Sequence, residues 1–477
     1  MRPFGSRERI AWTVVTAVLL AGLAFFALSP RLLAGSTEDE TQAYLATIGD
    51  VFRRIRDTYV DADKAAPRAL YEGALKGMFD ALGDPYSMYL TPAEWTDMTD
   101  ISTGSFGGVG LEITKVDKVG AQVVSALEGT PGYRAGVTAG DTIVKVNGNS
   151  VADLTLSAIR DQLRGPPKTD VTVTIKRGDA VQFDATITRE IIQLRTVKSA
   201  MMPGGIGYLR LSEFTPQSAA QCRDAIRSFM AAGYTSMILD LRGNPGGLLN
   251  SAVDVANLFI DQGLIVQRKS DRVASENVTY NARRGRMIVD ARIPVVVLVD
   301  RYSASAAEIL SGALKDYHRA TLIGEKTYGK GSVQTVEGLG DGGYRLTTSR
   351  YYTPAGATTG VSIDHKGIEP DRTITEPELT DEQQKALNDL LNGTFIKDFV
   401  KATPHASDAD IARFISSLHG KGITLDDRYL RRLIHAQQNI TNNSPTPYDL
   451  DFDIVLQAAV KALANHEIIA GEASGKS

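Results

Sequence analysis

The pattern of apolar and polar residues between positions 206 and 300 alternates between short apolar runs and amphipathic segments. The runs Ile206 to Leu211, Ser236 to Leu241 and Ile293 to Asp300 predict strands, and the stretches that end near Met230 and Ile260 predict helices. The third run is continuously apolar, which suits a strand buried on both faces. Alternating strands and helices of this kind predict a layered α/β domain.

Helical patterns also precede and follow this region. From Thr41 to about Ser102, apolar residues recur at i, i+3 and i+4, as in an amphipathic helix. The first part carries an apolar stripe that must be covered, by the rest of the chain or by a second subunit: Tyr44, Leu45, Ile48, Val51, Phe52 and Ile55. Beyond about Thr375 the chain is polar with helical spacing, as in Asp381 to Leu387. No function follows from that C-terminal pattern.

The N-terminus carries a membrane-targeting pattern. Basic residues precede an uncharged apolar stretch, Ile10 to Leu28, which is longer than a usual signal-peptide core and just long enough to span a bilayer. Small residues at Ala27 to Ser29 also suit cleavage, so a retained anchor and a cleaved signal both stay open. Either way the rest of the chain is exported. In a Gram-negative bacterium this predicts a periplasmic protein, free or anchored to the inner membrane by residues 10–28.

Composition narrows the classes of partner and cofactor. The 477 residues carry 52 basic and 56 acidic side chains, which argues against nucleic acid and leaves proteins or peptides as partners. The single cysteine, Cys222, lies in an amphipathic stretch and suits packing more than nucleophilic attack. One cysteine builds no thiolate site and the sequence has no His-Glu-x-x-His pair, so we expect neither a metal nor an organic cofactor.

Between residues 104 and 190 the pattern changes to short strands and glycine turns. The segment Ala135 to Gly148 makes this region resemble a PDZ domain, and Ser157 to Leu163 supplies the helix that would flank its groove. A glycine-rich loop leaves backbone N–H groups free to bind a terminal carboxylate while the peptide adds a strand to the sheet edge. The candidate loop, which also suits a plain hairpin turn, consists of Gly107, Gly108, Val109 and Gly110.

Two short segments carry the candidate catalytic chemistry. Ser305 follows the buried strand and precedes a helical stretch, where free backbone N–H groups can stabilise an oxyanion. Ser305 and Glu308 also form a capping-box pattern, which needs no catalysis. Lys330 lies between two glycines, an unusual place for a solvated ammonium. Burial would favour its neutral amine, which can accept the serine proton, so the two segments predict a serine nucleophile with a lysine base.

Gln334 could hold the amine of Lys330 through its amide oxygen. A straight strand would separate the two Cα atoms by roughly 13 Å, so this contact needs a bend at the glycines. A histidine base is the alternative, as in Ser-His-Asp hydrolases. Of the six histidines, His365 is the one rival to Lys330.

The segments Tyr302 to Glu308 and Tyr328 to Gln334 look like those of the carboxy-terminal processing proteases, tail-specific serine peptidases with an embedded PDZ domain. A third segment, Asp240 to Gly247, is similar to the family's aspartate-leucine-arginine element and its glycine pair. Only Ala307 departs from the core motif, where the family often has another serine.

The resemblance implies a role for each matching residue. Ser305 would be the nucleophile, Lys330 the general base and Gln334 the support of the lysine. Gly247 and Ala306 would supply the N–H groups of the oxyanion hole, each typically worth about 3 kcal/mol of transition-state stabilisation. The resemblance further implies a crotonase-like core, an active site between core and PDZ domain, and a dimer contact through terminal helices.

Together these patterns predict a multidomain α/β protein with an inserted PDZ domain. Its predicted parts are an export segment (1–35), an N-terminal helical region (36–103), the PDZ domain (104–190), a serine protease core (191–375) and a C-terminal helical region (376–477). The predicted function is a serine endopeptidase of the cell envelope that captures protein C-termini and cleaves near them, as a homo-oligomer and with an adaptor protein as a further partner. A non-catalytic PDZ scaffold and an esterase acting on lipid or cell-wall esters are the alternatives.

Overall fold

The computed structural model describes residues 40–127, 129–178, 181–377, 379–442 and 447–468. The predicted export segment, Ile10 to Leu28, lies outside the described residues. Across the described ranges no helix is both long and apolar enough to cross a membrane. The chain divides into two compact units, residues 1–91 and residues 92–477.

The first unit is helical, as the apolar spacing predicts. Its described part begins with a helix over residues 40–58 and continues with η1 (Ala62–Ala65), α2 (Pro67–Asp80) and the short strand β1 (Met88–Leu90). The apolar stripe of the first helix is largely exposed: Tyr44, Leu45, Ile48, Val51 and Ile55. Within the first unit, the described residues leave this stripe exposed.

The second unit opens with helix α3 (Pro92–Thr103) and the PDZ domain. An antiparallel sheet in the order β3-β4-β5-β7-β8 forms this domain, β6 pairs with β5, and β2 pairs with β9. Thirteen buried residues, among them Ile143 and Ile175, form its own core. The elements are β2 (Ser105–Gly108), β3 (Leu111–Val116), β4 (Gly120–Ala126), α4 (Pro131–Arg134), β5 (Thr142–Val146), β6 (Asn149–Ser150), α5 (Leu156–Leu163), β7 (Asp170–Arg177), β8 (Val181–Thr188) and β9 (Glu190–Gln193).

The α/β core that follows the PDZ domain is built on a six-stranded sheet in the order β10-β11-β12-β15-β16-β19. The first pair is antiparallel and the others are parallel. The predicted strands and helices of this region are confirmed, with shifts of a few residues at their ends. The strands are β10 (Val197–Met202), β11 (Ile206–Leu211), β12 (Ser236–Asp240), β15 (Val295–Val299), β16 (Thr321–Gly324) and β19 (Arg372–Thr373).

Helices cover both faces of this sheet. On one face α6 (Ser218–Ala231), α7 (Leu249–Ala256) and α8 (Ala306–Asp316) pack on side chains such as Leu239 and Val297. On the other face α14 (Ile454–Ala464) packs on the alternate side chains, such as Ile238 and Val296. Because successive strand residues point to opposite faces, this double burial explains why the central strands are continuously apolar.

A second, antiparallel sheet contains β13 (Leu264–Lys269), β14 (Val278–Asn281), β17 (Ser332–Leu339) and β18 (Gly342–Tyr352). The hairpin of β17 and β18 begins directly after the segment that carries Lys330. Helix α3 packs on this hairpin, since a Cβ added at Gly343 would come within 2.1 Å of the Trp95 ring. The short helix η2 (Ala274–Glu276) joins β13 to β14, and α9 (Pro354–Thr359) follows β18.

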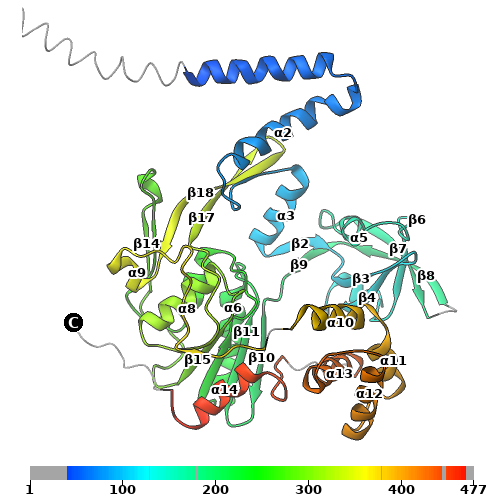
Figure 1. Ribbon diagram of the computed structural model, residues 1–477, viewed down its shortest axis with the longest axis vertical. Coiled ribbons are helices and arrows are strands. Elements are labelled where there is room, and N and C mark those ends of the chain that lie inside the picture. The colour runs from blue at the N-terminus through cyan, green and yellow to red at the C-terminus, as the bar shows by residue number, and fades with distance from the viewer. Residues whose placement is uncertain (1–39, 128, 179–180, 378, 443–446, 469–477) are drawn as a thin grey trace, which may run out of the picture. The chain divides into compact units, whose positions relative to one another are not determined.

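The C-terminal region is helical, as predicted, but its helices contribute to two separate hydrophobic clusters. Helices α10 (Asp381–Asn392), α11 (Phe395–Ala402), α12 (Asp408–Gly420) and α13 (Asp427–Thr441) share their own hydrophobic cluster and form the orange group in Figure 1. Helix α14, drawn in red, belongs instead to the α/β core. The apolar face of α14 is therefore part of the domain that carries Ser305.

Candidate active site

Ser305 lies at the turn between β15 and α8, where the sequence predicts it. Its φ is +53°, a value that is rare for a residue other than glycine. Such strain persists where the surrounding structure over-determines it and is typical of functional sites. Ser305 is half-buried and its neighbours on both sides, Ala304 and Ala306, are buried. The turn therefore presents one partly accessible hydroxyl from a rigid surrounding.

Glu308 joins this turn to the segment that carries Lys330. Its side chain is fully buried in α8. Oε2 accepts hydrogen bonds from the backbone N–H groups of Ser305 and Lys330, both at 2.8 Å. Oε1 accepts from the Thr327 hydroxyl at 2.6 Å and from the Gly329 N–H at 2.7 Å. One carboxylate therefore fixes the backbones of both predicted catalytic residues next to each other.

The environment of Glu308 pulls its pKa in two directions. Burial raises the pKa of this carboxyl above its ordinary value, and the four donated hydrogen bonds oppose that rise without cancelling it. The sequence pattern indicates only a helix cap at Glu308, and it misses the contact with Lys330. A charged residue inside a helix of small, buried residues is the signal that could have revealed it.

Lys330 occupies a segment that approaches its neighbours closely. A Cβ at Gly331 would lie 2.2 Å from the backbone nitrogen of Asp364, so only glycine fits there. Before Lys330, the Tyr328 N–H donates to the Ser303 carbonyl at 3.0 Å, which ties this segment to the serine turn a second time. The Lys330 side chain is half-buried. The flanking glycines thus allow a tight loop that brings a lysine beside Ser305.

Gln334 lies near the start of β17, on a segment that is not a straight strand. β17 begins at Ser332, and its register with β18 shifts between Val333 and Gln334. The amide nitrogen of Gln334 donates to the hydroxyls of Ser332 at 2.9 Å and Thr347 at 3.1 Å. These two bonds fix the orientation of the amide, so that its oxygen is the atom available for a lysine amine.

The glycine turn after β12 lies against the serine turn. A Cβ at Gly246 would come within 2.8 Å of the Ser305 Cβ and 3.0 Å of the Ala306 nitrogen. The Ala304 N–H donates to the Asn244 carbonyl at 2.9 Å, and this hydrogen bond links the serine turn to the glycine turn. The structure therefore brings together Gly246, Gly247, Ser305 and Ala306.

The two predicted oxyanion donors have N–H groups that the surrounding backbone pairing does not use. Gly247 has a φ of +131° and forms a bridge with Phe214. The bonds of that bridge run from the Phe214 N–H to the Gly246 carbonyl and from the Leu248 N–H to the Phe214 carbonyl, both at 2.8 Å. Ala306 is the first residue of α8, so its N–H has no acceptor within the helix.

A buried network of charges lies at the start of the glycine turn. The Arg242 guanidinium donates to Asp240, through Nε at 3.0 Å and Nη2 at 2.7 Å, and Asp240 also accepts from the Tyr208 hydroxyl at 2.7 Å. Burial alone would raise the pKa of Asp240, but the hydrogen bonds and charge of Arg242 lower it below the ordinary value. Burial raises the pKa of Tyr208, with Asp240 adding to that rise.

The two alternative nucleophile or base residues are placed unfavourably. His365 has a side chain that is 89% exposed and lies 3.8 Å from the Asp364 carboxylate. Such a solvated ring is poorly suited to act as a fixed base. Cys222 is a buried core residue of α6, and burial raises the pKa of its thiol to about 12. The prediction that Cys222 packs in the core is confirmed.

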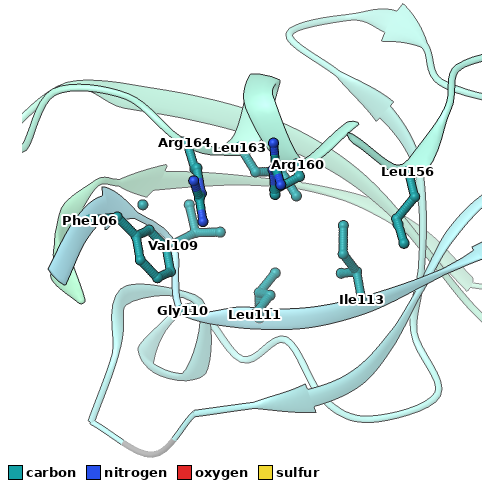
Figure 2. A pocket seen from close by; sticks show the side chains of 10 residues that line it. Phe106, Val109, Gly110, Leu111, Ile113, Leu156, Arg160, Leu163 and Arg164 are labelled. Atoms are coloured by element: carbon teal, nitrogen blue, oxygen red, sulfur yellow. The ribbon is translucent and has the colours of Figure 1, made fainter. Parts of the chain in front are cut away.

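The PDZ domain contains an apolar groove of about 240 Å³ between β3 and α5 (Figure 2). Figure 2 shows Leu111 and Ile113 from β3 on one side and Leu156 and Leu163 from α5 on the other. At one end the Arg164 guanidinium lies over the Phe106 ring, 4.4 Å from its centroid. The remaining lining residues are Gly108, Val109, Gly110 and Arg160.

The glycine loop beside this groove is shorter than predicted. Gly107 and Gly108 belong to β2 and pair with Ile191 and Glu190 of β9. Gly107 does not line the groove, and a Cβ there would lie 2.1 Å from the Gly165 carbonyl oxygen. The predicted loop from Gly107 to Gly110 thus begins with two strand residues, and its last three residues, Gly108, Val109 and Gly110, line the groove. Glycine at 107 serves close packing between backbone segments.

Comparisons with known proteins agree with this architecture. The chain matches the sequence models of peptidase family S41 over residues 205–374, of a PDZ domain over 122–177 and of the activating protease CtpB N-terminal domain over 30–93. The Carboxy-terminal-processing protease of Bartonella bacilliformis is 39% identical over 376 residues, which is 78% of this chain and 83% of that protein. The Carboxy-terminal processing protease CtpA of Bacillus subtilis is 34% identical over 75% of each chain.

Among solved structures, the photosystem II D1 C-terminal processing protease is 31% identical, and the alignment covers 69% of this chain and 92% of that one with a TM-score of 0.40. The sequence matches and the site define a serine-type peptidase. The chain belongs to the carboxy-terminal processing proteases of peptidase family S41, with a PDZ domain in addition to the peptidase core. The family resemblance predicted from the serine and lysine segments is confirmed.

Proposed function

We propose that Ser305 and Lys330 form the catalytic pair of this peptidase. The observation that carries this proposal is the shared hydrogen bonding of both residues to Oε2 of Glu308. The neutral amine of Lys330 takes the proton of the Ser305 hydroxyl as its oxygen attacks the scissile carbonyl carbon. The ammonium then gives this proton to the departing amine, and water releases the acyl group by the same two steps.

The oxyanion formed in each step lies, in this proposal, between the N–H groups of Gly247 and Ala306. Two features support it: the glycine turn lies against the serine turn, and the bridge to Phe214 leaves the Gly247 N–H unused. Preorganised donors of this kind stabilise the charge that develops in the transition state. The amide oxygen of Gln334 orients the Lys330 amine toward Ser305, because the amide nitrogen is already committed to Ser332 and Thr347.

The PDZ groove, in the same proposal, captures the C-terminal tail of an unfolded protein substrate. The tail adds a strand beside β3, and apolar side chains enter the space between Leu111 and Leu156. The backbone N–H groups of the segment that lines the groove, Gly108 to Gly110, bind the terminal carboxylate, and the positive charge of Arg164 at the same end favours an anion. Cleavage then occurs within the captured segment.

We infer the cellular setting from the N-terminal sequence. The basic residues and apolar stretch before residue 29 support export to the periplasm, with or without retention on the inner membrane. The exposed stripe on the helix over residues 40–58 supports self-association, because a soluble helix rarely leaves such a face uncovered. The Ile48→Glu variant should then lower the molar mass measured by light scattering to that of one chain. An adaptor protein is a further partner compatible with a PDZ groove.

Two substrates that differ only at one end test the proposed function. An unfolded protein with a free, apolar C-terminus and the same protein with a C-terminal amide are incubated with the wild type and with Ser305→Ala. We expect cleavage of the free-tailed substrate by the wild type alone, and slower cleavage of the amidated one because it lacks the carboxylate. Equal cleavage by Ser305→Ala would contradict the proposed nucleophile, and equal rates on both tails would contradict tail capture.

A further inference from the structure

Arg242 is held by a second carboxylate that comes from the far end of the chain. Its Nη1 donates to Asp453 Oδ1 at 2.8 Å and its Nη2 to Asp453 Oδ2 at 2.6 Å, in addition to the two bonds with Asp240. The three side chains are 16%, 7% and 0% exposed for Arg242, Asp453 and Asp240. A buried guanidinium that makes two-point contacts with two carboxylates has a fixed position and orientation.

Asp453 is itself fixed by helix α14. It is the N-cap residue, and its Oδ1 accepts from the Leu456 N–H at 2.9 Å. The helix behind it is anchored in the sheet, because Leu456 and Ala459 are fully buried in the same cluster as Ile238 and Val296. The carboxylate of Asp453 is therefore a rigid attachment point that the C-terminal segment provides to the peptidase core.

Arg242 stands where the chain leaves β12 and enters the glycine turn. Its N–H donates to Asp240 Oδ1 at 3.0 Å, so the side chain and backbone of Arg242 share one anchor. The next N–H, that of Gly243, donates to both oxygens of Asp300 at 3.0 and 3.1 Å. Asp300 also accepts from the Tyr302 N–H at 3.0 Å, on the serine turn. A displacement of Arg242 would thus also shift the glycine turn after β12 and the turn that carries Ser305.

We propose that Asp453 is a positioning residue for catalysis: through Arg242 it fixes the turn that presents the Gly247 N–H to the oxyanion. This inference rests on the proposed oxyanion role of Gly247 and adds to it a residue outside the matched peptidase region, residues 205–374. The C-terminal segment then has a direct catalytic purpose besides covering the sheet.

Two variants of the full chain separate this role from the capping role of Asp453. Asp453→Asn and Asp453→Ser both keep a good N-cap for α14 and remove one of the two negative charges that hold Arg242. A matched control is Glu467→Gln, which breaks the ion pair between Arg372 on β19 and the segment just after α14. That control weakens another attachment of the C-terminal segment and leaves Arg242 untouched.

We expect both Asp453 variants to lower kcat about tenfold to a hundredfold, less than the hundredfold to thousandfold loss typical of deleting an oxyanion donor. KM for an unfolded protein with a free tail should stay within about twofold, because the PDZ groove is unchanged. The rate of Ser305 phosphonylation by a fluorophosphonate should fall in parallel, since its oxygen occupies the oxyanion site. Glu467→Gln should match the wild type.

Wild-type kcat in both Asp453 variants would overturn the proposal. Loss of the folded state in both variants, as judged by thermal unfolding, would overturn it as well, because Asp453 would then be needed for the stability of the whole domain and not for the position of the glycine turn. A failure of the proposed function itself is distinguishable. In that case the wild type and Ser305→Ala would show the same activity and the same lack of labelling.

Discussion

Ser305 and Lys330 are joined through a single atom, because their backbone N–H groups both donate to Oε2 of Glu308 at 2.8 Å. The Glu308 carboxylate connects the two segments of the site. It caps helix α8, which follows Ser305, and it accepts hydrogen bonds from the loop that carries Lys330. The distance between the backbones of the two proposed catalytic residues is thus set by a buried side chain. The Thr327 hydroxyl and the Gly329 N–H complete its coordination.

Glu308→Gln should therefore damage the site while changing the shape of the side chain very little. All four partners of the carboxylate are donors, so the amide NH₂ of glutamine would face donors with no acceptor. We expect the free energy of unfolding to fall by about 1–3 kcal/mol and kcat to fall at least about tenfold. Urea unfolding and steady-state kinetics measure the two effects. Wild-type kcat in this variant would show that the bridge does not position the pair.

The same variant has a defined pH signature. Since the folded pKa of Glu308 is raised above the ordinary 4.5, its contribution to stability is present below pH 4.5 and is lost as the pH rises through the folded pKa. Glu308→Gln should lack this loss. Asp410→Asn, at the capping box of α12, is the matched control, because Asp410 accepts from Ser407 in the same way but contacts neither catalytic segment. That control should keep wild-type kcat.

A charge placed in the PDZ groove should weaken substrate capture and spare the chemistry. Leu156 lines the groove at the start of α5 (Figure 2), and Leu156→Glu puts a carboxylate where an apolar tail would lie. We expect KM for a free-tailed unfolded protein to rise about tenfold or more, since burying an unpaired charge is costly, with kcat within about twofold. Val124→Glu on the exposed face of β4 is the control. An unchanged KM in Leu156→Glu would argue against capture in this groove.

Cys222 should be inert in the folded protein. Burial raises the pKa of its thiol to about 12, so at pH 8 about one molecule in ten thousand carries the reactive thiolate. Ellman's reagent at pH 8 should react slowly with the native protein and stoichiometrically after unfolding in urea. Prompt reaction in the native state would show that the core around α6 opens readily.

His419 should make a small, pH-dependent contribution to the stability of the C-terminal helices. Its Nε2 faces Asp427 at 2.8 Å and its Nδ1 faces the Ile423 carbonyl at 2.9 Å, and these contacts raise its pKa above the ordinary 6.5. The resulting stability is present below pH 6.5 and is lost as the pH rises through the folded pKa. Thermal unfolding of His419→Asn should lack this decline, whereas His405→Asn should retain it.

Much of the fold and the site could be predicted because the decisive signals are local. The apolar run ending at Asp300 and the helical spacing after Ser305 together place the serine at a turn, and the glycines around Lys330 indicate a tight loop. The hairpin of β17 and β18 was not predicted. Its strands are half-exposed and lack the continuous apolar pattern of the central sheet.

The features that the sequence does not predict depend on contacts between segments that are far apart in the chain. Asp453 meets Arg242 only after the chain has folded, and nothing around it in the sequence distinguishes it from an ordinary helix cap. The sequence pattern does not separate α14 from the polar C-terminal region, because the apolar stretch from Ile454 is short. Glu308 fits the capping-box pattern, and this pattern does not indicate its hydrogen bond with the Lys330 N–H. For Asp453 and Glu308, the local sequence correctly predicts a helix-capping role. It does not reveal the second contact that each side chain makes with a distant segment.

The most direct test of the central claim compares the wild type with Lys330→Ala and Lys326→Ala. Lys326 lies shortly before the catalytic segment and is exposed in an ion pair with Glu369, so it controls for loss of a positive charge. Cleavage of an unfolded protein with an apolar C-terminus is followed by mass spectrometry. We predict that Lys330→Ala loses cleavage at least about a thousandfold while Lys326→Ala cleaves like the wild type. Cleavage by Lys330→Ala at the wild-type rate would contradict the serine–lysine mechanism.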